Sequence, residues 1–140
     1  LDLYAGTGSL GIEALSQGAG WADFVDLDQR QCAVIQANLR STGFSGRSRV
    51  RTGAVLQTLS KLESPYRLVL LDPPYKLEEL DEVLGAMASN PNLIDNTGMV
   101  VAGHSRRLEL NSEYLSLYRV SQRRYGDNAV DFYRNEAGTE

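Results

Sequence analysis

A glycine-rich turn near the start of the chain restricts the fold more than any other feature of the sequence. Gly6, Gly8 and Gly11 have the spacing G-x-G-x-x-G, directly after the apolar segment 1–5 and before a helical pattern at 10–17. Such a turn lets the backbone approach a ligand closely, and the helix N-terminus offers unpaired N–H groups to an anion or a carboxylate. The pattern alone is shared by dinucleotide-binding folds.

Strands and helices alternate after this turn, which is typical of a parallel sheet covered by helices on both faces. We expect strands at 1–5, 22–27, 50–52, 67–71 and 98–102, and helices at 10–17, 28–43, 55–62 and 77–87. Two further strands, 114–124 and 129–134, are expected to pair as an antiparallel hairpin. The predicted fold class is α/β and Rossmann-like, with a mostly parallel sheet and a C-terminal antiparallel hairpin.

Length and composition favour a single domain, because 140 residues with 42% hydrophobic content bury one core but not two. We place the domain at 1–134, expect 135–140 to be a flexible tail, and expect an N-terminal substrate-binding segment to be absent. No apolar run is long enough to span a membrane, and the single Cys32 predicts no internal disulfide. These features favour a cytoplasmic protein, and we expect a monomer.

The net charge of −4 argues against indiscriminate binding to nucleic acid, because the phosphate backbone favours an excess of Lys and Arg. Segregated charges still permit a local basic face. A basic group with a neighbouring aromatic ring, suited to phosphates and a stacked base, consists of Arg106, Arg107, Arg123, Arg124 and Tyr125. We expect these side chains to contact RNA, and the alternative is ordinary solvated surface.

Acidic residues stand where a nucleoside ligand could be held. Asp26 ends the second expected strand, about 20 residues beyond the glycine turn, where a carboxylate accepts hydrogen bonds from a ribose diol. Asp28 then serves as the cap of the following helix. Asp2 lies within an apolar strand, where a carboxylate is costly unless it is paired. The alternative reading makes Asp26 and Asp28 caps or turn residues only.

A tetrapeptide with an unusual set of side chains, Asp72-Pro73-Pro74-Tyr75, follows the fourth expected strand. It would lie beside the glycine turn, at the sheet edge where open α/β folds bind their ligands. The Asp72 carboxylate and the Pro73 carbonyl can accept hydrogen bonds from an exocyclic base amine, which favours the reactive pyramidal nitrogen, and Tyr75 can hold the base. The alternative is a rigid turn with Tyr75 as packing. We expect no metal, since the sequence has no Cys/His cluster.

Together these motifs resemble one known family. The segments DLYAGTGSLG (2–11), LDPPY (71–75), GMVV (98–101), HSRR (104–107) and RRYGD (123–127) are similar to the RsmD family of small-subunit ribosomal RNA guanine-N2 methyltransferases, over nearly the whole chain. The resemblance implies a class I methyltransferase fold and S-adenosylmethionine as the donor, with S-adenosylhomocysteine as its product. It also implies a guanine of 16S ribosomal RNA as the acceptor, within a small-subunit assembly particle.

Carried over by position, the resemblance assigns the target amine to the tetrapeptide 72–75. Asp2 would face the amino group of the cofactor's methionine part, whereas dinucleotide dehydrogenases usually have an apolar residue there. The cofactor contacts that the resemblance implies are Asp2, Tyr4, Ala5, Gly6, Thr7, Gly8, Asp26, Leu27, Gly53, Ala54 and Asp72.

The chain departs from the family pattern at two positions. Many relatives have an acidic or amide residue where this chain has Gly53, so adenine recognition is expected from backbone groups of Gly53 and Ala54. Gly103 stands where relatives often have Glu, which weakens any role assigned to that position.

Two other functions stay open from the sequence. A DNA adenine-N6 methyltransferase carries the same tetrapeptide, and a non-catalytic nucleotide-binding Rossmann module shares the glycine turn. His104, the single histidine, is expected in a loop without a catalytic role, because a methylated amine readily loses its proton to water or to Asp72.

Overall fold

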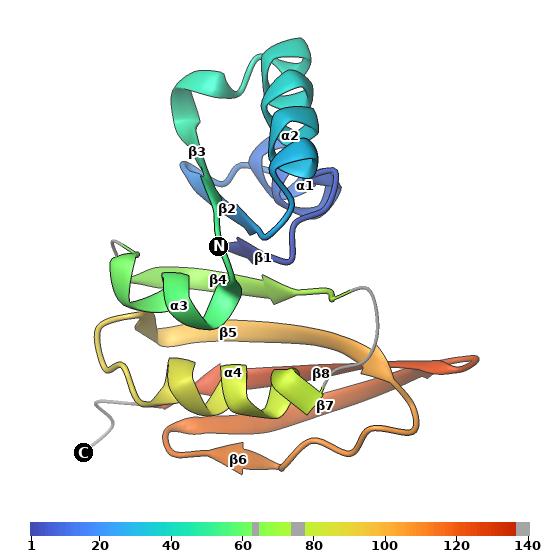
Figure 1. Ribbon diagram of the computed structural model, residues 1–140. Coiled ribbons are helices and arrows are strands. Elements are labelled where there is room, and N and C mark those ends of the chain that lie inside the picture. Colours follow the sequence, from blue (N-terminus) through green and yellow to red (C-terminus); the bar gives the residue numbers. More distant parts are fainter. Residues whose placement is uncertain (63–64, 74–77, 137–140) are drawn as a thin grey trace.

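The computed structural model describes residues 1–62, 65–73 and 78–136. The strands of these residues form one sheet in the order β3-β2-β1-β4-β5-β8-β7-β6 (Figure 1). Pairing is parallel from β3 to β5 and antiparallel from β5 to β6. The strands are β1 (Asp2–Leu3), β2 (Ala22–Asp26), β3 (Ser48–Thr52), β4 (Tyr66–Leu71), β5 (Ile94–Ser105), β6 (Glu113–Tyr114), β7 (Leu117–Tyr125) and β8 (Asn128–Asn135).

Helices lie on both faces of the sheet. They are α1 (Ser9–Ser16), α2 (Gln29–Thr42), α3 (Val55–Thr58) and α4 (Glu78–Ala88), with 3-10 turns at Ser45–Arg47 and Leu59–Lys61. In Figure 1, α1 and α2 lie beside β1–β3, and α4 lies across β5, β8 and β7. Each face has its own core: Phe24 packs into one and its neighbour Val25 into the other, both fully buried. The predicted fold class is confirmed.

Local signals in the sequence define the helix ends well. The Asp28 side chain accepts a hydrogen bond from the backbone N–H of Arg30 at 2.8 Å, and Gly43 ends α2 in the left-handed region, with φ of 82°. Both are standard cap arrangements. Of the apolar stripe expected on the fourth helix, Leu80, Leu84 and Met87 are fully buried, while Leu77 lies outside the described residues. No helix in the described ranges is long and apolar enough to cross a membrane.

The C-terminal half differs from the expectation in three places. β5 runs from Ile94 to Ser105, longer at both ends than the strand expected at 98–102, so the polar residues 95–97 before it, which suggest a turn, belong to the strand. Asn135 was expected to start the flexible tail, but it is the last residue of β8, is 5% exposed, and donates to the carbonyl oxygens of Ile94 and Asp95. The short β6 was not expected. In the first two cases polar residues were read as turn or tail, and strand pairing overrides that local preference. In the third, the single strand expected at 114–124 is divided into β6 and β7.

Candidate active site

Four chain segments with predicted site residues meet at the carboxyl edge of the parallel strands. β1 lies between β2 and β4, with Leu3 opposite both Val25 and Leu71, and Asp26 of β2 lies opposite Thr52 of β3. The residues that follow these strands are therefore neighbours, although the sequence separates them widely (Figure 1). The structure brings the glycine turn, Asp26, Gly53 and Asp72 to one edge of the sheet.

The glycine turn has the geometry that its sequence pattern predicts. Gly6 and Gly8 have φ of 60° and 82°, a region that side chains other than glycine rarely adopt. A Cβ at Gly11 would lie 2.4 Å from Cε1 of Phe24, so the third glycine lets α1 pack closely on the sheet. Thr7 and Ser9 are exposed, and their amides donate to no atom within the described part of the chain. This end of α1 can therefore receive an anionic group.

Asp26 is hydrogen-bonded to the glycine turn, to the start of α2 and to the residue that follows β3. Its carboxylate accepts hydrogen bonds from the backbone N–H of Gly6 and of Asp28, both at 2.9 Å, and its carbonyl accepts from the Gly53 N–H at 2.9 Å. A carboxylate has about four lone-pair sites, so capacity for a diol is left. Leu27, beside it, is 72% exposed, which leaves an apolar side chain free at this edge.

Two polar contacts that sequence reasoning missed hold the turn in place. The Asn38 side chain of α2 donates to the Thr7 carbonyl at 2.9 Å, and the Tyr4 hydroxyl donates to the Glu79 carboxylate of α4. Tyr4 itself has φ of 59°, a conformation that costs a non-glycine residue about 1–3 kcal/mol. Ala5 is fixed by a backbone bond from its N–H to Val25. No local pattern signals these contacts, which cross from one element to another.

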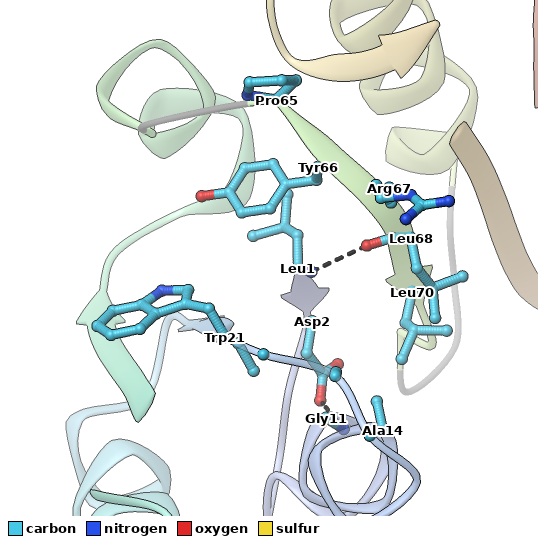
Figure 2. A pocket seen from close by; sticks show the side chains of 14 residues that line it. Leu1, Asp2, Gly11, Ala14, Trp21, Pro65, Tyr66, Arg67, Leu68 and Leu70 are labelled. Carbon is cyan, nitrogen blue, oxygen red and sulfur yellow. Dashed lines mark hydrogen bonds between the residues drawn. The ribbon is translucent and has the colours of Figure 1, made fainter. Parts of the chain in front are cut away.

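Asp2 is buried at the base of the turn rather than exposed beside it. It is 2% exposed, and its carboxylate accepts a hydrogen bond from the Gly11 N–H at 3.0 Å (Figure 2). Burial is the main cause that raises the pKa of Asp2 to about 7; the Gly11 hydrogen bond and the charged N-terminus lower it, and the carboxylates of Asp72 and Asp26 contribute to the rise. Its predicted contact with a cofactor amine therefore stays a prediction. Asp2 also lines a separate pocket of about 440 Å³ at the amino ends of β1 and β4.

Asp72 stands at the carboxyl end of β4, exposed, and is followed by the buried Pro73. The structure explains the glycine at position 103, which the sequence did not: a Cβ there would lie 2.9 Å from Oδ1 of Asp72. Gly103 therefore leaves room for the carboxylate. Pro74 and Tyr75, the other half of the tetrapeptide, lie outside the described residues. Within the described ranges, no cluster of His, Cys, Asp and Glu could hold a metal ion.

The expectation that His104 lies in a loop is wrong. It lies in β5, is 8% exposed, and its Nε2 is 3.0 Å from Oδ1 of Asp131 in β8. Asp131 is fully buried, and a carboxylate between Val130 and Phe132 is the same signal of a paired acid that pointed to Asp2. Sequence reasoning could have found this pair and did not.

The residues predicted to contact RNA do not share one surface. Arg123 and Arg124 are consecutive in β7, so their side chains point to opposite faces of the sheet. Arg106 and Arg107 follow β5 and line a hollow of about 340 Å³ together with Ser105 and Asp127. Tyr125, 58% exposed, ends β7 on the same face as Arg123.

Comparison with known proteins gives a consistent result. The model of the family described as "Conserved hypothetical protein 95" matches residues 1–134. YlbH of Bacillus subtilis is 34% identical over 137 residues, which cover 96% of this chain and 74% of that protein. Ribosomal RNA small subunit methyltransferase D of Escherichia coli is 33% identical over 95 residues, 68% of this chain. That match spans 48%, or about half, of the Escherichia coli protein.

A solved structure supports the fold. The RNA methyltransferase from Salinibacter ruber, in complex with S-adenosyl-L-homocysteine, superposes with a TM-score of 0.72 over 99% of this chain and 81% of that chain, at 13% identity. At this identity the likeness concerns the fold alone. The chain therefore has the class I methyltransferase fold that the sequence predicted.

Proposed function

The chain belongs to the family described as "Conserved hypothetical protein 95", and on this premise we propose that it methylates ribosomal RNA with S-adenosylmethionine as the donor. The acceptor we propose is the exocyclic N2 amine of a guanine in 16S ribosomal RNA. The name of the Escherichia coli relative, Ribosomal RNA small subunit methyltransferase D, supports the substrate. The observation that carries the proposal is the position of Asp72 next to the glycine turn, on the neighbouring strands β4 and β1.

The residues at this edge fit the proposed cofactor. The free amides of Thr7 and Ser9 suit its carboxylate, and the remaining lone pairs of Asp26 suit its ribose hydroxyls. Leu27 offers an apolar contact for an adenine ring, and the backbone at Gly53 lies next to Asp26. Asp2, buried behind the turn, would balance a positive charge. When bound, S-adenosylmethionine supplies an electrophilic methyl group on a sulfonium.

The chain's own contribution to the reaction is orientation. Asp72 and the Pro73 carbonyl would accept hydrogen bonds from the target amine and so direct the nitrogen lone pair toward the methyl group. Holding two reactants in this way can supply about 7 to 11 kcal/mol of the barrier. After transfer, the positively charged nitrogen loses a proton to water or to the Asp72 carboxylate. Stacking of the base on Tyr75 stays a prediction from the sequence, as do the assembly particle, the monomeric state and the cytoplasmic location.

The test is transfer of labelled methyl from S-adenosylmethionine to unmodified small-subunit ribosomal RNA, free or within particles, followed by mapping of the labelled nucleotide. Asp72→Asn should reduce transfer about 10²- to 10³-fold, because an acceptor at the reacting amine is lost. Asp95→Asn is the matched control, since Asp95 is a half-buried carboxylate in β5 whose side-chain partner among the described residues is Arg67, at 3.8 Å.

Three outcomes would contradict the proposal. Preferential labelling of duplex DNA would favour an adenine-N6 methyltransferase of DNA. Binding of NAD without binding of S-adenosylmethionine, measured by calorimetry, would favour a non-catalytic nucleotide-binding module. Labelling of the RNA at a position other than a guanine N2 would keep the enzyme class and overturn the acceptor.

A further inference from the structure

A polar hollow of about 230 Å³ lies under the β7–β8 hairpin, next to the carboxyl end of β5. In Figure 1 the segment that joins β5 to β6 passes along this end of the hairpin. Few apolar side chains face the hollow, and three arginines from two separate parts of the chain do. Its lining consists of His104, Arg106, Leu108, Glu109, Leu110, Arg119, Gln122, Arg124 and Ala129.

The buried Asp131 carboxylate contacts three of the side chains that line this hollow. Its Oδ1 accepts a hydrogen bond from Gln122 at 2.7 Å and lies 3.0 Å from the His104 ring, and its Oδ2 accepts from Arg119 at 3.1 Å. Burial alone would raise the pKa of Asp131, but the hydrogen bonds from Gln122, His104 and Arg119 outweigh burial and hold it below its ordinary value. The carboxylate is therefore charged and fully buried, and it fixes the polar side chains around it.

Arg119 is anchored and still has donors to spare. Its Nη1 donates to Asp131 and, at 3.4 Å, to the carbonyl of Leu110. A guanidinium has five N–H donors, which is more than these bonds use, and the side chain is 28% exposed. A guanidinium whose position is fixed in advance loses little side-chain entropy when it binds an anion.

Arg106 and Arg124 complete the basic rim. Arg106 is held by a hydrogen bond from its Nη1 to the Gly126 carbonyl at 2.9 Å. Arg124 lies across the strand pair from Ala129, and within the described residues it makes no hydrogen bond or ion pair. Its neighbour Arg123 points to the other face of the hairpin. Among the residues that the structure describes, Arg124 thus has no side-chain partner, and it lines the same hollow as Arg106 and Arg119.

The charges around the hollow suit a singly charged anion. The lining contains the cationic Arg106, Arg119 and Arg124 and the carboxylate of Glu109, and the buried carboxylate of Asp131 lies behind it, 3.1 Å from Arg119. This leaves one positive charge before His104 is counted, which matches a phosphodiester better than an uncharged or cationic ligand. Planar guanidiniums also bind phosphate oxygens in pairs.

We propose that this hollow holds a backbone phosphate of the RNA, close to the nucleotide that is methylated. His104, which lines it, follows directly after Gly103, the residue over which the Asp72 carboxylate fits. The phosphate site and the reactive amine site therefore lie at the same end of β5. Arg106, Arg119 and Arg124 bind the phosphate, and Asp131 is a positioning residue that acts through Arg119. This inference rests on the proposed function.

The experiment measures binding of a small-subunit ribosomal RNA transcript at several salt concentrations, together with methyl transfer to it. Arg124→Gln should weaken binding about fivefold and lower the slope of log affinity against log salt by about 0.7 to 1, as expected for one lost phosphate contact. Arg40→Gln removes the same charge from an exposed position of α2, in the other half of the molecule and outside the residues expected to contact RNA, so it is the matched control and should change the slope little. Arg124→Lys keeps the charge and should keep the wild-type slope.

Each result has a distinct meaning. If wild-type protein neither binds the transcript nor methylates it, the proposed function fails. If wild type methylates it while Arg124→Gln and Arg40→Gln give equal salt slopes, the phosphate site is refuted and the proposed function stands. Binding of inorganic phosphate that Arg124→Gln abolishes, with RNA affinity unchanged, would assign the hollow to a small anion and overturn the proposal. Urea unfolding of each variant verifies that the fold is intact.

Discussion

Both halves of the sheet bury carboxylates, Asp2 and Asp23 in the parallel half and Asp131 in the antiparallel half, and Asp2 and Asp131 differ in the donors that surround them. Asp131, in the antiparallel half, is surrounded by donors from Gln122, His104 and Arg119. Asp2, in the parallel half, has one donor, the Gly11 N–H. Burial acts on both, yet the pKa of Asp131 is lowered and the pKa of Asp2 is raised to about 7. Among the described residues, three side chains contact the Asp131 carboxylate, whereas the Asp2 carboxylate accepts one hydrogen bond, from a backbone N–H.

This contrast separates a structural carboxylate from one suited to a ligand. A buried charge that its own chain neutralises needs nothing more and stabilises the surrounding structure. A buried carboxylate next to a glycine turn, with a pKa in the neutral range, can accept a cationic group from outside. We therefore expect changes at Asp131 to affect mainly stability, and changes at the glycine turn to affect mainly the reaction.

The largest effect on the free energy of unfolding should come from removing the Asp131 carboxylate. Asp131→Ala leaves Arg119 and His104 without their shared acceptor, and we expect a loss of about 3 kcal/mol in the free energy of unfolding, the low end for a broken buried pair because Arg119 is partly exposed. Urea unfolding measures it, with Asp95→Ala as a control at a half-buried carboxylate. A loss below about 1 kcal/mol would mean that the four side chains do not stabilise the hairpin.

Removing the charge of Asp2 should have the opposite effect and increase the free energy of unfolding. Because folding raises the pKa of Asp2 from 3.8 to about 7, the stability of the wild type falls as the pH rises through this interval. Asp2→Asn should therefore match the wild type at pH 5 and exceed its stability by about 2 kcal/mol at pH 8, less than the full linkage of about 4 kcal/mol because the amide NH₂ must also be buried.

Urea unfolding at the two pH values tests the Asp2 prediction, and calorimetry with S-adenosylmethionine should find weaker binding by the variant. The charged form of Asp2 is the one that attracts a cation, so wild-type affinity should rise with pH through about 7. An affinity independent of pH in the wild type would contradict the role of Asp2.

A substitution at Gly103 tests whether methyl transfer depends on the position of the Asp72 carboxylate. Gly103→Ala places a Cβ 2.9 Å from Oδ1 of Asp72, closer than such atoms normally approach, so the carboxylate must move. We expect methyl transfer to fall about tenfold, equivalent to about 1.4 kcal/mol of barrier, with S-adenosylmethionine affinity nearly unchanged. Gly46→Ala is the control, because a Cβ there meets no atom within 4 Å. Equal activity of the two variants would show that the position of Asp72 does not matter.

The smallest effect should come from removing the Asn38 side chain, which holds the glycine turn by one hydrogen bond. Asn38→Ala removes the bond to the Thr7 carbonyl, and we expect the dissociation constant of S-adenosylmethionine to rise about threefold, in line with the loss of one partly exposed hydrogen bond of about 0.6 kcal/mol. Calorimetry measures it. Thr42→Ala, which removes a bond within α2 only, should leave the affinity unchanged.

Local patterns determined most of the parallel half in advance. Helix periodicity, the glycine spacing and the cap at Asp28 act over a few residues, so the order of strands and helices and the shared edge of Gly6, Asp26 and Asp72 followed from the sequence. The tetrapeptide itself could be placed at the end of β4, although Pro74 and Tyr75 lie outside the described residues.

Tertiary structure alone decided the arrangement of the antiparallel half. The bond between His104 and Asp131 joins residues 27 positions apart, and it forms because β5 pairs with β8. The pairing of β7 with β8 draws Asn135 into a strand and sets Arg124 opposite Ala129. The pairing of β4 with β5 sets Gly103 over Asp72. Contacts of this kind depend on which strands pair and in which register, and no short stretch of the chain encodes that.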